Sequence, residues 1–383
     1  MQQLKRKRTT RTLDKPAPLP PQPPRPRIYL DEATCRAHNA GLDAAAYNAS
    51  TSEATGIWDL PFRATAALLP RVEHLTAADA VAAPAELVRV HVEAKDEDIA
   101  RVTSAKYRAW LARDEGRTPG SFLDRDKTTM WTEGTLQAAR CSAGAVLDAA
   151  EHVFATSDSG VRRAFVVVRP PGHHNSCGDI IEDYFDVDDG VEGNFVWGCH
   201  GGCIYNNVAM AIRKIQSERR VRFAVVDLDA HFGDGTALHF WHDPSVLTIS
   251  IHWGQSEAGN MYPFLQGGPD ERGGEGAEGA CLNLPLPDDS DDVALATAMN
   301  NALMALRAFQ PEGIFVACGF DALDVDLSSP LKFTPEGYGK ALTALIEAYP
   351  GVPLLATWEG GYTTMRQADA FEQVIYAMRH VTH

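Results

Sequence analysis

The fold is decided by the run FAVVDLDAHFGD, residues 223–234. Residues 223–228 are apolar except for one aspartate, which is typical of a short strand buried on both faces of a sheet. Asp229, His231 and Asp234 follow at once. Carboxylates and an imidazole at the end of a buried strand cost free energy unless they are solvated, paired or bound to a metal. The run therefore predicts both a central strand and a functional site at its carboxyl end.

Four further apolar runs repeat this arrangement, with helical patterns among them. The runs are 164–168, 246–251, 314–318 and 353–357, and the helical patterns are 204–218, 291–309, 334–349 and 364–380. Strands that alternate with helices predict an α/β fold with a central, mostly parallel β-sheet flanked by helices. The motifs RPPGHH, SIH, GFDA and EGGY close or follow the four runs. Because such sheets bind ligands beyond the carboxyl ends of their strands, we expect the active site at this edge.

Composition narrows the class of protein. The chain has 383 residues, of which 45% are hydrophobic, and this suffices for one large domain with a sizeable core. It has no run of about 18 apolar residues, its first residues are basic and polar without a following apolar stretch, and its seven cysteines are scattered without a CxxC pair. We therefore expect a soluble, unsecreted protein of the nucleus or cytoplasm, without membrane contact. The net charge of −16 favours cationic partners and argues against direct nucleic-acid binding.

The first 26 residues differ in composition from the rest of the chain. Residues 1–26 join a basic cluster to a proline-rich run, and we expect a flexible arm with polyproline II character there. The basic cluster fits a nuclear-localisation signal or a plain solvated tail. Residues 27–383 are expected to form a single catalytic domain.

A metal site is predicted from three residues at two strand ends. Asp229 and His231 offer carboxylate and imidazole ligands, a mixture that suits zinc or iron(II). Asp321 follows the run 314–318 and can supply a third ligand, which leaves a coordination position open for catalysis. The alternative is an acidic loop without a metal.

Proton-transfer groups stand at neighbouring strand ends. His173 and His174 titrate near neutrality, as a base and an acid for amide hydrolysis must. Asp227 and Asp234 are available behind the two imidazoles to fix their tautomers. Tyr362, on a glycine-rich turn, can donate to a developing oxyanion. Each motif alone also fits surface histidines or a structural tyrosine, so the prediction rests on their combination.

The motifs together resemble a known superfamily. They occur in the order RPPGHH, GGCIYNN, DLDAHFGDGT, SIHW, CGFDA, TPEGY and WEGGY. This resembles the arginase-like deacetylase superfamily, which includes histone deacetylases and acetylpolyamine amidohydrolases, with the class II histone deacetylases looking nearest. The resemblance is good over residues 160–365 and poor over the first 130. It implies the arginase/deacetylase fold and zinc-dependent hydrolysis of the N-acetyl or N-acyl amide of lysine side chains.

The resemblance also implies roles for individual residues. They are Asp229, His231 and Asp321 for zinc, His174 with Asp234 as general base and then acid, His173 with Asp227 for electrostatic tuning, and Tyr362 as a clamp on the carbonyl oxygen. A structural potassium ion is implied, with ligands from Asp227, Asp229, Ser250 and the carbonyls of His231 and Ile251. Gly202 falls where an aromatic residue of the acyl-lysine tunnel usually sits, and Tyr262 falls on the facing aromatic position.

An acidic insertion, residues 175–201, departs from the family pattern. Residues 175–198 contain seven acids and no Lys or Arg: Asp179, Glu182, Asp183, Asp186, Asp188, Asp189 and Glu192. Since the insertion begins beside His174, we expect it to rim the active-site mouth and attract a lysine-rich tail or a polyamine; a solvated loop is the alternative. A second zinc on Cys177, Cys199, His200 and Cys203 is a further alternative, although their spacing matches no standard finger.

Two further departures concern the tunnel. Gly202 removes one wall unless Phe195 or Trp197 replaces it, and a wider tunnel would admit acyl groups bulkier than acetyl. Ser328 stands near the family's usual leucine and offers neither an apolar wall nor an anionic gatekeeper, so polyamine selectivity is neither supported nor excluded.

The leading function is therefore deacetylation of protein lysines, with histone tails among the expected partners. Hydrolysis of acetylpolyamines or other small amides is the alternative within the same chemistry. A catalytically weak acyl-lysine-binding protein is the alternative from another class, and an arginase-type enzyme with two manganese ions fits the single ligand set less well.

Overall fold

The computed structural model describes most of the chain. The described residues are 25–31, 70–77, 84–113, 117–124, 128–156, 162–176, 198–255, 267–362 and 364–379. Nearly all of the predicted arm, most of the acidic insertion, Tyr262, Phe195 and Trp197 lie outside these ranges, so the predictions made for them stay predictions, as does the domain division at residue 27. Among the described helices, none has both the length and the apolarity to cross a membrane.

One eight-stranded sheet forms the centre of the structure. The strands are β1 (Arg27–Leu30), β2 (Glu86–Arg89), β3 (Arg163–Val167), β4 (Phe223–Asp227), β5 (Val246–Gln255), β6 (Cys281–Pro287), β7 (Gly313–Cys318) and β8 (Leu354–Trp358). Their order is β2-β1-β3-β8-β7-β4-β5-β6, and every neighbouring pair is parallel. The predicted α/β fold with a parallel sheet is confirmed.

The five predicted strands correspond to β3, β4, β5, β7 and β8, with ends that agree or differ by one residue, except that β5 extends to Gln255. Strands β1, β2 and β6 were not predicted. β1 and β2 have four residues each, and β6 carries two prolines, Pro285 and Pro287. Proline cannot donate to the ladder, and its presence fits the position of β6 at the sheet edge.

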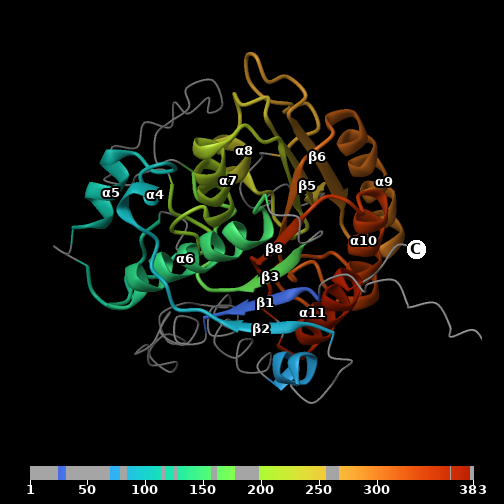
Figure 1. Ribbon diagram of the computed structural model, residues 1–383, viewed down its shortest axis with the longest axis horizontal. Coiled ribbons are helices and arrows are strands. Elements are labelled where there is room, and N and C mark those ends of the chain that lie inside the picture. The colour runs from blue at the N-terminus through green and yellow to red at the C-terminus, as the bar shows by residue number, and fades with distance from the viewer. Residues whose placement is uncertain are drawn as a thin grey trace, which may run out of the picture.

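Helices cover both faces of the sheet (Figure 1). They are α4 (Asp96–Ile99), α5 (Ala105–Leu111), α6 (Thr135–Val153), α7 (Asn207–Glu218), α8 (Asp234–His239), α9 (Asp292–Phe309), α10 (Pro335–Ala348) and α11 (Thr364–Met378). α7, α9, α10 and α11 match the predicted helical patterns. Three of these begin at a capping side chain, since Asn206, Asp291 and Thr334 each accept a hydrogen bond from the first turn.

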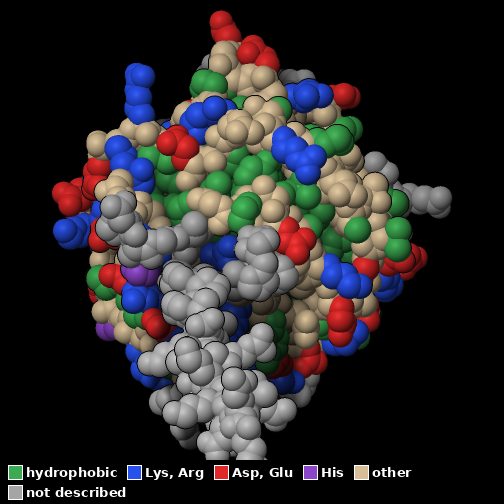
Figure 2. Space-filling model, turned by 45° about the vertical axis from the view of Figure 1, so that its right-hand side comes forward, with side chains coloured by type: hydrophobic (Ala, Val, Ile, Leu, Met, Phe, Trp, Pro, Cys, Tyr) green, Lys and Arg blue, Asp and Glu red, His purple; other side chains and the backbone are tan. Residues whose placement is uncertain are grey.

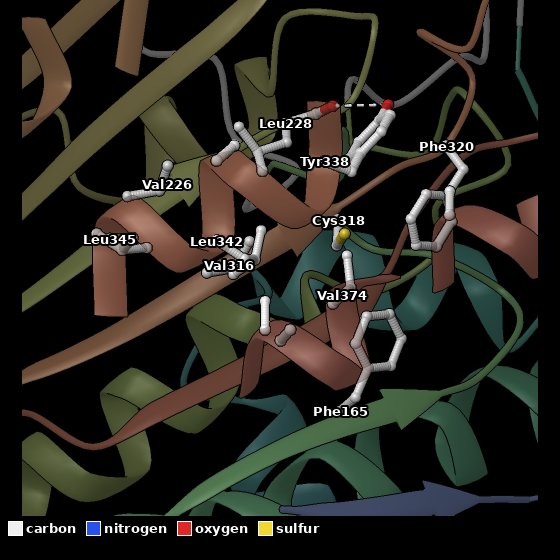
Figure 3. Close-up of a cluster of buried hydrophobic side chains, with 14 of the residues drawn as sticks. Phe165, Val226, Leu228, Val316, Cys318, Phe320, Tyr338, Leu342, Leu345 and Val374 are labelled. Atoms are coloured by element: carbon white, nitrogen blue, oxygen red, sulfur yellow. Dashed lines mark hydrogen bonds between the residues drawn. The ribbon is translucent and has the colours of Figure 1, made fainter. Parts of the chain in front are cut away.

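Two hydrophobic cores fill the space between the sheet and its helices. Alternate residues of β4 point to opposite faces: Ala224 and Val226 pack with α9, α10 and α11, whereas Phe223 and Val225 pack with α6 and α7. Figure 3 shows the first core, where the Tyr338 hydroxyl of α10 donates to the Leu228 carbonyl at 3.5 Å, just beyond β4. Both faces being covered explains why the central strands are apolar throughout.

The surface of the described residues carries both signs of charge. Figure 2 shows Lys and Arg side chains interspersed with Asp and Glu on the face turned toward the viewer, with apolar side chains between them. The negative net charge of the sequence is therefore not gathered into one patch of described residues on that face.

Candidate active site

The polar motifs of the sequence meet at one edge of the sheet. Strands β3, β8, β7, β4 and β5 are consecutive neighbours and all parallel, so their carboxyl ends lie side by side. The loop after β3 carries the two adjacent histidines, those after β4 and β7 carry aspartates, and that after β8 carries the tyrosine. The predicted position of the site is thus the position at which the motifs converge.

Three predicted metal ligands come together at the ends of β4 and β7. His231 Nδ1 lies 3.1 Å from Asp229 Oδ1 and 3.0 Å from Asp321 Oδ2. One ligand atom from each of the three lies within 4.8 Å of the others. Both aspartates are fully buried, while the His231 side chain is 12% exposed. The group therefore offers one nitrogen and two carboxylates, with the imidazole on the side open to solvent.

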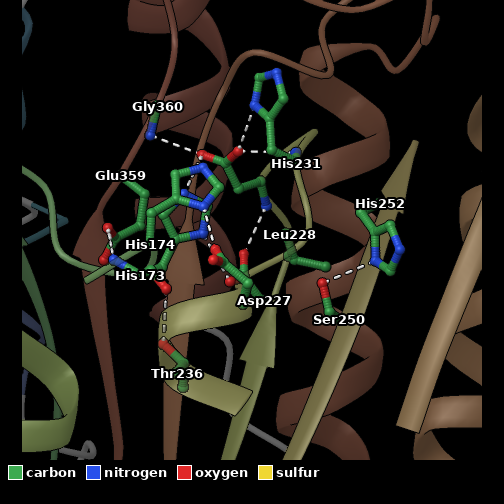
Figure 4. Close-up of polar contacts among 12 residues, drawn as sticks. His173, His174, Asp227, Leu228, His231, Thr236, Ser250, His252, Glu359 and Gly360 are labelled. Carbon is green, nitrogen blue, oxygen red and sulfur yellow. Dashed lines mark hydrogen bonds and ion pairs between the residues drawn. The ribbon is translucent and has the colours of Figure 1, made fainter. Parts of the chain in front are cut away.

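Backbone groups hold the two carboxylates in place. Gly360 N donates to Asp229 Oδ2 at 2.8 Å, the dashed line that starts at Gly360 in Figure 4. Ala230 N donates to Asp321 Oδ1 at 2.7 Å. A Cβ added at Gly360 would lie 2.3 Å from Asp321 Oδ2, and one at Gly319 would lie 2.0 Å from Asp229 Oδ2. Glycine is required at both positions because the chain passes directly against the ligand oxygens.

The electrostatics of this group favour a bound cation. Burial, and next the charge of Asp229, raise the pKa of Asp321 to about 7. Burial lowers the pKa of His231, but hydrogen bonds to Asp229 and Asp321 outweigh it and raise this pKa to about 10. Without a metal, the two carboxylates retain a proton on the imidazole between them, and a metal ion would replace that positive charge.

Each of the two adjacent histidines is paired with a carboxylate. His173 Nδ1 donates to Asp227 Oδ2 at 2.9 Å, and His174 Nδ1 donates to Asp234 Oδ1 at 2.7 Å. All four side chains are at most 5% exposed. In both rings Nδ1 makes the hydrogen bond, and Nε2 of His173 lies 3.7 Å from Asp229 Oδ2. The two predicted histidine–aspartate pairs are present.

The environment drives the two histidines toward different protonation states. Burial lowers the pKa of His173, but the charges of Asp229 and Asp227 together raise it well above its usual value. Burial and next the charge of His173 lower the pKa of His174 to about 3. Without a bound metal, these shifts favour a neutral His174 and a positively charged His173.

Tyr362 is placed by the turn after β8. Its N–H donates to Asp326 Oδ2 at 2.8 Å, and the preceding Gly361 has a φ of 121°, which suits glycine. Burial raises the pKa of the Tyr362 phenol well above its usual value, so the hydroxyl remains a donor. Asp326 also accepts from Ser328 N and Oγ at 3.0 and 2.8 Å, which links the tyrosine to the entrance segment.

A buried glutamate, Glu359, connects the loops after β3 and β8. Glu359 Oε2 accepts hydrogen bonds from Gly172 N at 2.7 Å and His173 N at 3.1 Å. Arg169 donates to the carbonyl of Glu359 at 2.7 Å. The histidine loop and the tyrosine loop are thereby joined through one buried side chain.

A cavity of about 220 Å³ opens onto these groups. Its lining residues are Thr128, Pro171, His173, His174, Gly201, Asp229, His231, Leu327, Ser328, Gly360 and Tyr362. Asp229, His231, His173, His174 and Tyr362 lie on its wall, whereas Leu327, which is 84% exposed, lies at its rim.

The described lining of the cavity includes one of the predicted entrance residues, Ser328. The neighbouring Leu327 supplies an apolar side chain that the sequence reasoning did not assign. Gly202 is not among the described lining residues, and Gly201 takes that place. His200 contacts Asp234 at 2.8 Å, while Cys203 lies near His173 and Glu359, so the second-zinc alternative gains no support among the described residues.

Two of the predicted potassium ligands lie next to each other on neighbouring strands. Asp227 and Ser250 are partners in the β4–β5 register. The Ser250 hydroxyl lies 2.9 Å from His252 Nδ1 (Figure 4). The potassium site stays a prediction.

Besides Leu327, sequence reasoning missed the contacts that three residues make at the site. His200 was considered only as a ligand of a second zinc, Glu359 lies within the motif WEGGY, and Thr128 lies outside every quoted motif. Their contacts join chain segments far apart in sequence. The glutamate in EGGY could have been singled out, since a buried acid at a strand end needs partners.

An α/β sheet with a mixed carboxylate–imidazole centre, two histidine–aspartate pairs and a tyrosine on one cavity is typical of a metal-dependent hydrolase. The family described as "Histone deacetylase domain" matches residues 63–378. The chain therefore belongs to the histone deacetylase family, whose members are hydrolytic deacetylases.

Individual relatives agree with this assignment. Histone deacetylase 8 of Arabidopsis thaliana is 29% identical over 77% of this chain and 69% of its own length. Histone deacetylase 6 of Caenorhabditis elegans is 29% identical over 78% of this chain, which spans 29% of that protein. Acetylpolyamine amidohydrolase of Burkholderia pseudomallei is 34% identical over 60% of this chain and 59% of its own length.

The fold is also similar to a solved structure. A crystal structure of the HDA15 HD domain has a TM-score of 0.74 and 25% identity, and covers 93% of this chain and 90% of that one. The arginase/deacetylase-like fold is confirmed.

Proposed function

We propose that this protein is a zinc-dependent hydrolase of the N-acetyl or N-acyl amide of lysine side chains in proteins such as histones. The observation that carries the proposal is the meeting of a three-ligand centre, a histidine paired with a carboxylate and a buried tyrosine beside one cavity. A lysine side chain would enter past the apolar rim and place its amide against these groups.

The ligand set fits zinc. Asp229 and Asp321 offer oxygens and His231 offers Nδ1, which are ligands that zinc accepts, and three protein ligands leave a position free. When bound, zinc would polarise the amide carbonyl and increase the acidity of a water molecule. Iron(II) accepts the same ligands, so metal analysis is required to separate the two.

Side chains of the protein would transfer the protons and stabilise the developing charge in the proposed reaction. His174 pairs through Nδ1 with Asp234, so its Nε2 would take a proton from water and later deliver it to the leaving lysine amine. His173, paired with Asp227, would tune the electrostatics near the reacting atoms. Tyr362 would donate a hydrogen bond from its hydroxyl to the oxyanion that develops on the carbonyl.

The choice between protein and polyamine substrates rests on the rim. Leu327 and Pro171 are suited to contact the alkyl chain of either substrate. The acidic insertion, residues 175–201, would attract a lysine-rich tail or a polyamine equally. Histone-type substrates are preferred here because the named relatives include several histone deacetylases, and the acetylpolyamine amidohydrolase relative makes acetylpolyamines the second candidate.

The test is a substrate profile on metal-reconstituted protein. Acetyl-lysine peptides, longer acyl-lysine peptides and acetylpolyamines are compared, each with and without a chelator. We expect chelator-sensitive turnover of acyl-lysine peptides. Tight binding of these peptides without turnover would instead support the acyl-lysine-binding alternative.

Two variants test the assigned roles. Tyr362→Phe and His174→Ala should each lower kcat by about 100-fold or more while the zinc content stays that of the parent. Near-full activity of either variant would refute its role. Amide replacements of the insertion acids should raise KM for cationic peptides more than for neutral ones, and an equal effect on both would refute electrostatic attraction by the insertion.

A further inference from the structure

His200 lies behind the carboxylate that holds the proposed base. Its Nε2 donates to Asp234 Oδ2 at 2.8 Å, while Oδ1 of the same carboxylate accepts from His174 Nδ1 at 2.7 Å. The rings of His174 and His200 are 5.0 Å apart. One carboxylate is thus held by two imidazoles, one on each oxygen.

The backbone around His200 is fixed. Cys203 N donates to the His200 carbonyl at 2.8 Å and closes a tight turn. Within that turn, Gly201 N donates to Thr128 Oγ1 at 2.8 Å and Gly202 N donates to Thr129 Oγ1 at 3.0 Å. The His200 side chain is 16% exposed. It is therefore held against Asp234 by its own chain segment and is not a freely rotating surface group.

The hydrogen bond from His200 restricts the orientation of the Asp234 carboxylate, which holds the proposed base His174. A carboxylate held at one oxygen can still turn about its side-chain bond, whereas one held at both oxygens cannot. Asp234 is the first residue of α8 and is 5% exposed at its side chain, so no bulk water can replace a lost partner. The orientation of His174, and hence the aim of its Nε2 into the cavity, depends on this carboxylate, and small misorientations of a base lower turnover strongly.

We propose that His200 is a positioning residue for the hydrolysis proposed above, which fixes Asp234 and through it the tautomer and direction of His174. The inference rests on the proposed function for its effect on turnover. The hydrogen bonds themselves do not depend on it.

A metal ion shared by His174, His200 and Asp234 is the other arrangement these three groups could support, since their ligand atoms lie close together. Nitrogen–oxygen distances of 2.7 and 2.8 Å are those of direct charge-assisted hydrogen bonds. The positioning role accounts for them without a second ion.

The test compares two substitutions of His200. His200→Phe keeps the size of a ring and removes the N–H donor, whereas His200→Gln keeps an amide N–H near the position of Nε2. His91→Phe is the matched control, because His91 pairs with Asp31 at 3.0 Å outside the site and is largely exposed. All proteins are loaded with zinc and assayed on an acetyl-lysine peptide, and the metal content per chain is measured.

We expect His200→Phe to lower kcat about tenfold, as loss of an outer partner of a catalytic group does, with KM changed by less than about twofold. His200→Gln should restore most of kcat, and His91→Phe should match the parent. In histidine-labelled protein, the downfield proton signal of His174 Nδ1–H should broaden in His200→Phe and persist in His200→Gln.

Three results would overturn the inference. One is a parental kcat and an unchanged N–H signal in His200→Phe. Another is an equal loss in both variants, which would indicate packing. The third is a second equivalent of metal that disappears with His200. If the parent protein hydrolyses no acyl-lysine substrate, the proposed function fails, yet the N–H signal still decides whether His200 positions His174.

Discussion

A single methyl group at Gly201 should displace the proposed base. Gly201 has a φ of 59°, and a Cβ there would lie 2.2 Å from His174 Cδ2 and 2.9 Å from Cγ. That distance is far below van der Waals contact, so in Gly201→Ala either the loop or the imidazole must move. His174 is held by Asp234 on its far side, so a shift of the ring also strains that hydrogen bond.

The neighbouring glycine provides a matched control. Gly202 has a φ of 76°, so alanine there meets a similar left-handed backbone, but its Cβ would find its nearest atoms at 3.8 Å, from Arg169 and Pro171. Both substitutions should cost about 1 kcal/mol in unfolding free energy for the backbone conformation. Gly201→Ala should cost about 1–3 kcal/mol more because of overpacking.

The two variants should separate clearly in turnover of an acyl-lysine peptide. We expect kcat to fall about 100-fold or more in Gly201→Ala, since a base displaced by about 1 Å loses that much. Gly202→Ala should stay within about threefold of the parent, which is less than 1 kcal/mol. Urea unfolding of both proteins supplies the stability difference. Equal kcat losses in the two variants would refute the claim that steric pressure on His174 is the cause.

Three further predictions concern metal, pH and the entrance. Asp321→Asn should lower metal affinity by more than about 100-fold, measured as bound metal after dialysis, whereas Asp324→Asn, whose carboxylate pairs with Arg366 at 3.1 Å, should bind metal like the parent. Burial lowers the pKa of His252 to about 4, below its usual 6.5, so the unfolded state binds more protons and this residue destabilises the protein as pH falls from 6.5 toward 4. His252→Phe should therefore lose about 2 kcal/mol less than the parent between pH 7 and pH 5 in urea titrations, and equal losses would contradict this account. Leu327→Ser should raise KM for long-chain acyl-lysine peptides roughly fivefold, about 1 kcal/mol, while Val325→Ser should not; an unchanged KM in Leu327→Ser would remove it from the substrate path.

The central part of the fold was predictable from sequence for a physical reason. β3, β4, β7 and β8 are covered on both faces, so most of their residues are apolar and the strands stand out from the helical patterns between them. β1, β2 and β6 lie toward the ends of the sheet, where short or proline-containing strands are tolerated and no clear pattern is required. Helix α6 was missed although it is long, because its alanine-rich sequence is buried against β3 and α7 and shows a weak polar face.

The site divides in the same way. The sequence predicts that three residues meet: Asp229, His231 and Asp321. Burying such side chains at a strand end costs free energy unless they are paired or bind a metal, and a parallel sheet brings its strand ends together. His200 and Leu327 were not predictable, because their roles come from contacts with Asp234 and with the cavity that no spacing rule encodes. Gly202 was singled out from the sequence as a tunnel position, but among the described residues its neighbour Gly201 lines the cavity.

Glu359 couples the loop that carries His173 and His174 to the loop that carries Tyr362. Glu359 holds the backbone of Gly172 and His173, and its own chain continues through two glycines to Tyr362. The loop proposed to transfer protons and the loop proposed to stabilise the carbonyl oxygen are therefore connected through Glu359, and we expect a disturbance of either loop to affect the other. A substitution of Glu359 would mimic the loss of a catalytic residue, although this side chain lies outside the cavity wall and acts through the loops it joins.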